Sequence, residues 1–139
     1  FVIRRADGVF AYQLATAVDD AVMGVTEVVR GDDLLTSTFQ QIWLQNTLRL
    51  PSPKYGHIPL LAAPDGRRLS KRDGDLDIGV LRQRFPRPEP VIGLLGFLAG
   101  LLDRPEPAAA GELIPLFDWK KLPHGEVTLT KELCRKFIQ

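Results

Sequence analysis

Apolar positions in the first half of the chain alternate between short strand-like runs and a helical repeat. Phe1 to Arg5 and the β-branched run Val25 to Val29 are typical of strands, and Asp7-Gly8 predicts a turn or hairpin after the first of them. A helix is predicted from Tyr12 to Met23, with Gly24 in the cap position at its carboxyl end. The apolar positions that recur at helical spacing are Leu14, Ala15, Val18 and Val22.

The alternation of strands and helices continues to residue 63. Thr36, Ser37 or Thr38 can cap a second helix that runs to about Leu50 and ends before two prolines. His57 to Ala63 is a further strand-like run. Because strand, helix and strand follow one another at these lengths, the sequence predicts an α/β fold with a parallel sheet unit.

From Leu76 onward the pattern becomes helical, with prolines between the segments. The change in pattern predicts a domain boundary between Gly66 and Gly74, and we expect one domain over residues 1–66 and a helical one over 67–139. The predicted helices are Leu76 to Phe85, Glu89 to Leu102, Ala108 to Phe117 and Thr130 to Ile138, with Thr130 as the cap of the last.

Composition narrows the classes of protein. The chain has 139 residues, 45% of them hydrophobic, which is enough for one or two small packed units. No apolar run reaches the length that spans a membrane. Lysine plus arginine number 18 against 17 for aspartate plus glutamate, which is not the charge of a strongly basic nucleic-acid binder. The single cysteine, Cys134, excludes an internal disulfide framework and a multi-cysteine zinc site, so we expect a cytoplasmic protein.

The most informative segment is the basic loop, residues 65–72, which follows the strand-like run His57 to Ala63. In this loop a glycine turn precedes Ser70, which stands among the cationic side chains Arg68, Lys71 and Arg72. Such a loop suits the binding of a triphosphate from which pyrophosphate leaves.

A second candidate site lies at the carboxyl end of the strand Val25 to Val29. Open α/β sheets bind ligands at this edge, and the guanidinium of Arg30 can hold a carboxylate in a fork geometry. Taken alone, Arg30 fits better as a strand-end residue paired with Asp32 or Asp33.

Other polar and aromatic residues have a structural interpretation beside the functional one. Tyr12 can orient a small polar substrate, although a lone tyrosine is more often half-buried core with a satisfied hydroxyl. We interpret His57 as packed structure and His124 as a surface loop residue. Trp119 with Phe117 fits a core better than a platform for stacking bases.

Several motifs in register resemble the glutamyl-tRNA synthetase family of class I aminoacyl-tRNA synthetases. Arg68-Leu69-Ser70-Lys71-Arg72 is similar to the KMSKS-type loop of that family, with Arg68 in place of the usual first lysine. The resemblance is close over the first half of the chain and looser over the rest. The matching segments, in order, are Asp7-Gly8, Tyr12, Val18-Asp19-Asp20, Met23 to Thr26, Val29 to Leu34, Ser37-Thr38, His57 to Leu61 and Leu69 to Arg72.

The resemblance implies a fold and a set of roles. It implies the second half of a class I synthetase Rossmann fold followed by a small helical subdomain. In that family, residues matching Tyr12 and Arg30 hold the substrate glutamate, and Asp33 lines the same pocket. The backbone of Leu60-Leu61 lies against adenine, and Ser70 and Lys71 bind ATP, with Lys71 as the catalytic residue. ATP as a substrate, Mg²⁺ bound with it, and tRNA as the acceptor are implied as well, with no zinc site in this chain.

Within the family, Arg30-Gly31-Asp32-Asp33-Leu34-Leu35 resembles the short branch, the glutamyl-queuosine tRNA(Asp) synthetases. That branch joins glutamate to the queuosine base in the anticodon of tRNA(Asp). Lys71-Arg72 is closer to the full glutamyl-tRNA synthetases, which act on tRNA(Glu) and remain an alternative. A degenerate, non-catalytic paralogue that binds nucleotide or RNA is a third alternative.

The family's HIGH-type ATP-binding motif has no match in the chain, whose histidines are His57 and His124. We therefore expect a fragment of an ATP-dependent ligase that lacks half of the ATP site and that cannot activate glutamate by itself. The helical second half contributes no further assignment.

Overall fold

The computed structural model describes residues 1–67, 69 and 78–137. These residues form two compact units, Phe1–Ile58 and Pro59–Gln139, each described by itself below. The division lies before the boundary predicted between Gly66 and Gly74. The assignment of residues 1–66 and 67–139 as a catalytic half and a helical subdomain stays a prediction.

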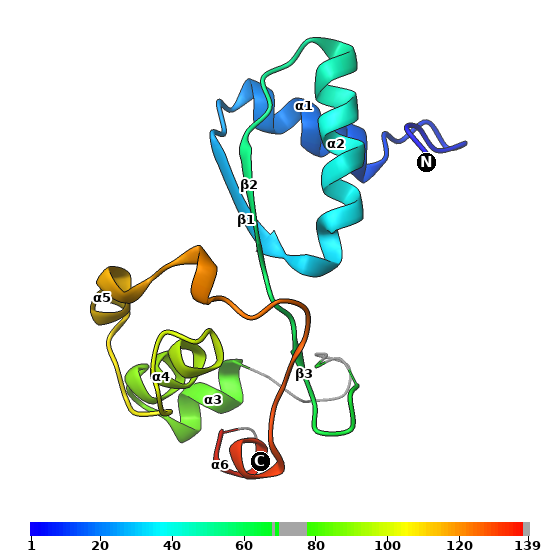
Figure 1. The fold of residues 1–139 in the computed structure, drawn as a ribbon. Helices are drawn as coiled ribbons and strands as arrows, with labels where there is room; N and C mark the ends of the chain where they lie inside the picture. The colour runs from blue at the N-terminus through cyan, green and yellow to red at the C-terminus, as the bar shows by residue number, and fades with distance from the viewer. Residues whose placement is uncertain (68, 70–77, 138–139) are drawn as a thin grey trace. The chain divides into compact units, whose positions relative to one another are not determined.

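The first unit is a parallel strand pair with two helices (Figure 1). Helices α1 and α2 pack against each other. The pairing aligns Val28 with Tyr55 and Arg30 with His57, so these four side chains leave the same face of the pair. The parallel sheet unit predicted from the alternation of elements is confirmed. The elements are α1 (Tyr12–Val22), β1 (Glu27–Gly31), η1 (Asp32–Leu34), α2 (Leu35–Leu48) and β2 (Lys54–Ile58).

Helix α1 ends where the sequence predicts. The backbone N–H groups of Met23 and Gly24 bond to carbonyls of the last turn. Gly24 has φ of +69°, a left-handed conformation that glycine adopts without a Cβ clash. This turn leads the chain directly into β1.

The amino-terminal segment differs from the expectation. The turn at Asp7-Gly8 is confirmed, with φ of +88° at Gly8. Residues 1–5 do not form a strand, however, since they make only an isolated antiparallel bridge from Arg4 to Phe10. A strand needs a neighbouring strand for its ladder of backbone hydrogen bonds, and in the described part of the chain none lies beside these residues.

Two further element bounds differ for physical reasons. Helix α2 starts at Leu35 after the 3-10 turn, so Thr36, Ser37 and Thr38 are helical and none of them is its cap. The run His57 to Ala63 is not one strand but the end of β2 and, after a break, β3 (Leu61–Ala62). The break follows from Pro59, which has no N–H to donate to a ladder.

The regular structure of the second unit is mostly helix, around a core of Leu94, Leu98 and Leu129. Two helices are shorter than predicted, since α4 ends at Leu98 instead of Leu102 and the run Ala108 to Phe117 forms only a four-residue α-helix and a 3-10 turn. The hydroxyl of Thr130 accepts a hydrogen bond from the N–H of Leu133 at 3.2 Å, which confirms Thr130 as the cap of α6. Besides β3, the unit contains α3 (Ile78–Arg84), α4 (Glu89–Leu98), α5 (Ala110–Leu113), η3 (Ile114–Leu116), η4 (Trp119–Lys121), β4 (Val127–Thr128) and α6 (Lys131–Phe137).

The sequence did not indicate the parallel pair of β3 with β4, in which Leu61 lies opposite Val127. Two-residue strands are too short to show a period of two. The expectation of a buried pair at Phe117 and Trp119 is also wrong. Their rings meet edge to face with 5.2 Å between centroids, yet the two residues stay 45% and 47% exposed.

Candidate functional site

The guanidinium of Arg30 lies at the carboxyl end of β1, where the sequence placed it. Its Nη2 donates a hydrogen bond to the hydroxyl of Thr38 on α2 at 2.6 Å. One face of the guanidinium covers the ring of Tyr55 on β2, 5.0 Å from the ring centroid. One edge of this half-buried cation therefore contacts a neutral hydroxyl, and one face contacts a neutral aromatic ring.

No carboxylate neutralises Arg30 among the residues that the structure describes, so the expected strand-end pair with Asp32 or Asp33 is not formed. The Nε–H of Arg30 is buried and has no hydrogen-bond partner in this part of the chain. A buried charge without a counterion is costly, and an unmet charged donor adds to that cost. The site is electrostatically suited to an anionic ligand.

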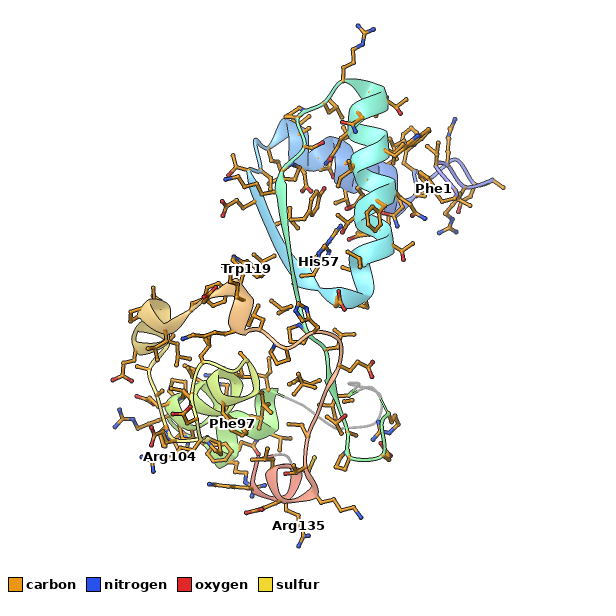
Figure 2. The ribbon with its side chains drawn as sticks, in the orientation of Figure 1. Phe1, His57, Phe97, Arg104, Trp119 and Arg135 are labelled. Atoms are coloured by element: carbon orange, nitrogen blue, oxygen red, sulfur yellow. The ribbon has the colours of Figure 1, made fainter. Side chains whose placement is uncertain are left out.

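The hydroxyl of Thr38 on α2 contacts three other elements of the first unit. It donates to the carbonyl of Leu34 at 3.1 Å, as helical threonines commonly do, and accepts from Arg30. Nε2 of His57, labelled in Figure 2, lies 2.8 Å from the same oxygen. Thr38 is only 4% exposed, so its hydroxyl is largely shielded from water.

A polar stripe on α2 continues from Thr38. Gln41 and Gln45 follow on the same face of the helix and are fully buried. Gln41 donates to Oε1 of Gln13 on α1 at 2.9 Å, and Gln13 donates in turn to Ser37. Gln45 donates to the hydroxyl of Tyr55 at 3.3 Å. The packing of α2 is thus polar near Arg30, and this is costly for folding because Oε1 of Gln41 and of Gln45 are buried without a partner in the described part of the chain.

Sequence reasoning missed most of this network. We interpreted His57 as packed structure and Thr38 as one of three possible caps, whereas Thr38 bonds directly to Arg30 and His57 bonds to Thr38. The signal was present in the spacing of Thr38, Gln41 and Gln45, which places three polar side chains on one helical face. A helix packed on a sheet normally has apolar residues there.

The other residues expected to hold glutamate are not joined to Arg30. Tyr12 is the first residue of α1 and is 54% exposed, so it is not a half-buried core residue. Within the described residues, no hydrogen bond or ring contact links Tyr12 to Arg30. Asp33 lies in η1 and is exposed. Their roles in glutamate binding stay predictions.

The residues expected to bind ATP belong to the second unit. The carbonyl of Leu60 accepts from the N–H of Val127 at 2.8 Å, and that of Leu61 accepts from Leu69 at 3.4 Å. A carbonyl oxygen can accept two hydrogen bonds, so each of these two carbonyls can still accept one more. Ser70 and Lys71, together with Arg68, lie outside the described residues.

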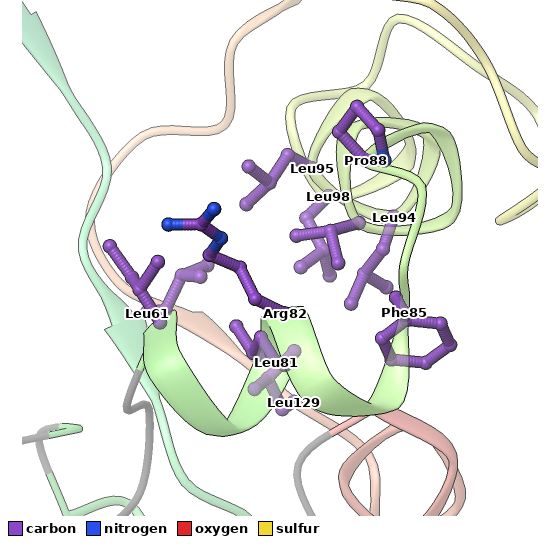
Figure 3. A pocket seen from close by; sticks show the side chains of 11 residues that line it. Leu61, Leu81, Arg82, Phe85, Pro88, Leu94, Leu95, Leu98 and Leu129 are labelled. Atoms are coloured by element: carbon purple, nitrogen blue, oxygen red, sulfur yellow. The ribbon is translucent and has the colours of Figure 1, made fainter.

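A cavity of about 460 Å³ opens in the second unit (Figure 3). Its described lining is leucine-rich and comes mainly from α3 and α4, with Arg82 as the one charged side chain there. Such a lining has too few polar groups to orient glutamate or a triphosphate.

The described residues contain no group of three or more His, Cys, Asp or Glu side chains that could hold a metal ion. None of their helices combines the length and apolar character needed to cross a bilayer.

Comparison with known proteins gives consistent relationships. The family model for the catalytic domain of class I tRNA synthetases for E and Q (glutamate and glutamine) matches residues 1–103. A glutamyl-Q tRNA(Asp) synthetase of Symbiobacterium thermophilum is 52% identical over 132 residues, covering 95% of this chain and 41% of that protein. Glutamate–tRNA ligase 2 of Alkalilimnicola ehrlichii is 42% identical over 141 residues, covering 91% of this chain and 30% of that protein.

The fold is similar to that of a solved glutamate tRNA ligase from Elizabethkingia meningosepticum in complex with its amino acid. The TM-score is 0.74 at 27% identity, over 97% of this chain and 31% of that one. The chain thus spans less than half the length of each of these relatives. Its family match covers the whole first unit and extends into the second as far as Asp103. The chain therefore belongs to the catalytic-domain family of the class I tRNA synthetases for glutamate and glutamine.

Proposed function

We propose that the protein containing this chain activates L-glutamate with ATP and transfers the glutamyl group to tRNA. The observation that carries the proposal is the half-buried guanidinium of Arg30, which has no carboxylate partner in the described part of the chain. Glutamate has a side-chain carboxylate, so its pocket needs a fixed cation, and a guanidinium can bind a carboxylate through two parallel hydrogen bonds. The names of the relatives support the same substrate.

The chemistry assigns a separate task to each group. Arg30 binds the side-chain carboxylate, and Tyr12 and Asp33 line the pocket. An oxygen of the glutamate α-carboxylate then attacks the α-phosphate of ATP, so that a new oxygen–phosphorus bond forms and the bond to pyrophosphate breaks. The ammonium of Lys71 neutralises charge that builds on the phosphates, and Ser70 and the backbone of Leu60-Leu61 hold the nucleotide. In this proposal magnesium enters with the triphosphate, because proteins usually bind it through substrate phosphates together with one or two carboxylates.

The favoured acceptor is the queuosine base of tRNA(Asp). Support comes from the segment Arg30 to Leu35 and from the match to a glutamyl-Q tRNA(Asp) synthetase over 95% of the chain. The alternative acceptor is tRNA(Glu), which the match to a glutamate–tRNA ligase and the pair Lys71-Arg72 favour. A cytoplasmic location is part of the same proposal.

The test is glutamate-dependent exchange of pyrophosphate into ATP by the full-length protein, with and without tRNA. We expect exchange without tRNA and a loss of roughly 10²–10³ in rate for Lys71→Ala. Labelled glutamate should then appear on tRNA(Asp) that contains queuosine and not on tRNA(Asp) that lacks it. Exchange only in the presence of tRNA(Glu) would favour the alternative acceptor. No exchange under any condition would leave a non-catalytic paralogue.

A further inference from the structure

The orientation of the Arg30 guanidinium depends on a hydroxyl that forms hydrogen bonds with three groups. Thr38 Oγ1 has Nη2 of Arg30 at 2.6 Å, Nε2 of His57 at 2.8 Å and the carbonyl of Leu34 at 3.1 Å. The three partners come from β1, β2 and η1, whereas Thr38 itself belongs to α2. These hydrogen bonds therefore connect four elements of the first unit, β1, η1, α2 and β2.

The protons of this group can be assigned by counting donors. Arg30 has no acceptor, so its Nη2 must donate to Thr38. The single proton of the Thr38 hydroxyl points to the carbonyl of Leu34, the usual bond of a helical threonine to the residue four positions earlier. In this assignment His57 has the tautomer with its proton on Nε2 and donates as well. In this arrangement the hydroxyl donates once and accepts twice, which uses its full capacity.

We propose that Thr38 and His57 are positioning residues that fix the orientation in which Arg30 meets its carboxylate ligand. This inference rests on the proposed function for the identity of the ligand, but its structural part does not. The hydroxyl fixes the Nη2 edge of the guanidinium, and the ring of Tyr55 fixes its plane. Fork binding of a carboxylate tolerates only about 10–20° of misorientation, so a side chain held in this way is ready for it. His57 acts through Thr38, because its Nε2–H prevents the hydroxyl from rotating away.

The matched variants are Thr38→Val and Thr38→Ser in the full-length protein. Valine keeps the shape and removes the shared oxygen, whereas serine keeps the oxygen. We expect Thr38→Val to raise KM for glutamate about 10- to 100-fold, as expected for a lost hydrogen bond to a charged group. KM for ATP and kcat should stay within about threefold of wild type, and Thr38→Ser should recover most of the loss. A second pair, His57→Leu and His57→Gln, repeats the test, because leucine removes the N–H donor and glutamine keeps one. This second pair replaces the first if Thr38→Val does not fold.

A second readout separates failure of this inference from failure of the proposed function. The NMR order parameter of the Arg30 Nε–Hε bond in the ligand-free protein reports the rigidity of the guanidinium. We expect a clear loss of order in Thr38→Val and recovery in Thr38→Ser. An unchanged order parameter, or equal rises in KM for glutamate and ATP, would show that Thr38 has a structural role only. If the wild type shows no glutamate-dependent exchange, the proposed function fails, and the order parameter still decides whether Thr38 positions Arg30.

Discussion

The guanidinium carbon of Arg30 lies 5.0 Å from the centre of the Tyr55 ring. Arg30 and Tyr55 belong to adjacent parallel strands, and their side chains leave the same face of the pair. A cation over an aromatic face is stabilised by about 0.5–2 kcal/mol, according to how far it is desolvated. The ring therefore supports the one cation that we assign to the glutamate carboxylate.

Removal of the Tyr55 ring should weaken glutamate binding, whereas removal of its hydroxyl should not. We expect Tyr55→Leu to raise KM for glutamate about 2- to 30-fold, the equivalent of the lost cation–aromatic energy. Tyr55→Phe is the matched control, because both variants lose the 3.3 Å bond from Gln45 and only leucine loses the ring. Equal KM values for the two variants would contradict the role of the ring.

The buried Gln45 should contribute little to stability despite its hydrogen bond. Its Oε1 is buried without a partner in the described part of the chain, and its bond to the Tyr55 hydroxyl is long at 3.3 Å. An unmet buried acceptor costs about 1–3 kcal/mol, which exceeds the net gain from one neutral hydrogen bond. We expect Gln45→Met to be as stable as wild type or more stable in urea unfolding. Gln45→Ala should lose about 2 kcal/mol or more through the cavity it leaves. A clear loss of stability in Gln45→Met would show that the amide is needed.

Close packing in the second unit depends on Gly93 of α4. A Cβ at this position would meet the carbonyl oxygen of Glu106 at 1.8 Å and its carbon at 2.7 Å. Since the obstacle is backbone, we expect Gly93→Ala to lower the stability by about 1–3 kcal/mol and the Tm by several degrees. Gly111 of α5 is the control, because nothing lies within 4 Å of a Cβ there. Gly111→Ala should be neutral or gain up to about 1 kcal/mol. Similar Tm values for the two variants would contradict this packing.

The start of α4 should be sensitive to pH. Hydrogen bonds from the exposed Arg87 guanidinium to the Glu89 carboxylate, the shorter of them 2.7 Å, hold the pKa of Glu89 below its usual value. Because the folded pKa is depressed, the stabilisation is present above the unfolded pKa and is lost as the pH falls through the folded pKa. We expect Arg87→Ala to raise the pKa of Glu89 toward its usual value in an NMR titration of the carboxyl carbon. An identical pKa in the variant would show that the pair does not form in solution.

The sequence predicted those parts of the structure that depend on local signals. Gly24 ends α1 because only glycine readily takes the conformation needed there, and Thr130 caps α6. Arg30 was placed at the carboxyl end of a strand because a β-branched run precedes it. The local pattern could not indicate which ligand Arg30 would bind, and the resemblance to the family, which the comparisons support, supplied that expectation.

The parts that the sequence did not predict depend on contacts between distant residues. The role of Thr38 needs Arg30 and His57, which lie 8 and 19 residues away. From the sequence, a threonine near the start of a helix can be the cap or can lie inside the helix. The position of η1 before α2 shows that Thr38 lies inside the helix. The pair of β3 with β4 likewise depends on segments more than 60 residues apart in sequence, which no local pattern records.

The most direct test of the central claim is the KM for glutamate of the full-length protein with Arg30→Lys. Lysine keeps the positive charge but loses the fork that binds a carboxylate through two hydrogen bonds. If Arg30 holds the glutamate side chain, KM for glutamate rises by roughly 10-fold to 100-fold while KM for ATP stays unchanged. An unchanged KM for glutamate would contradict the claim and would assign the carboxylate to another cation.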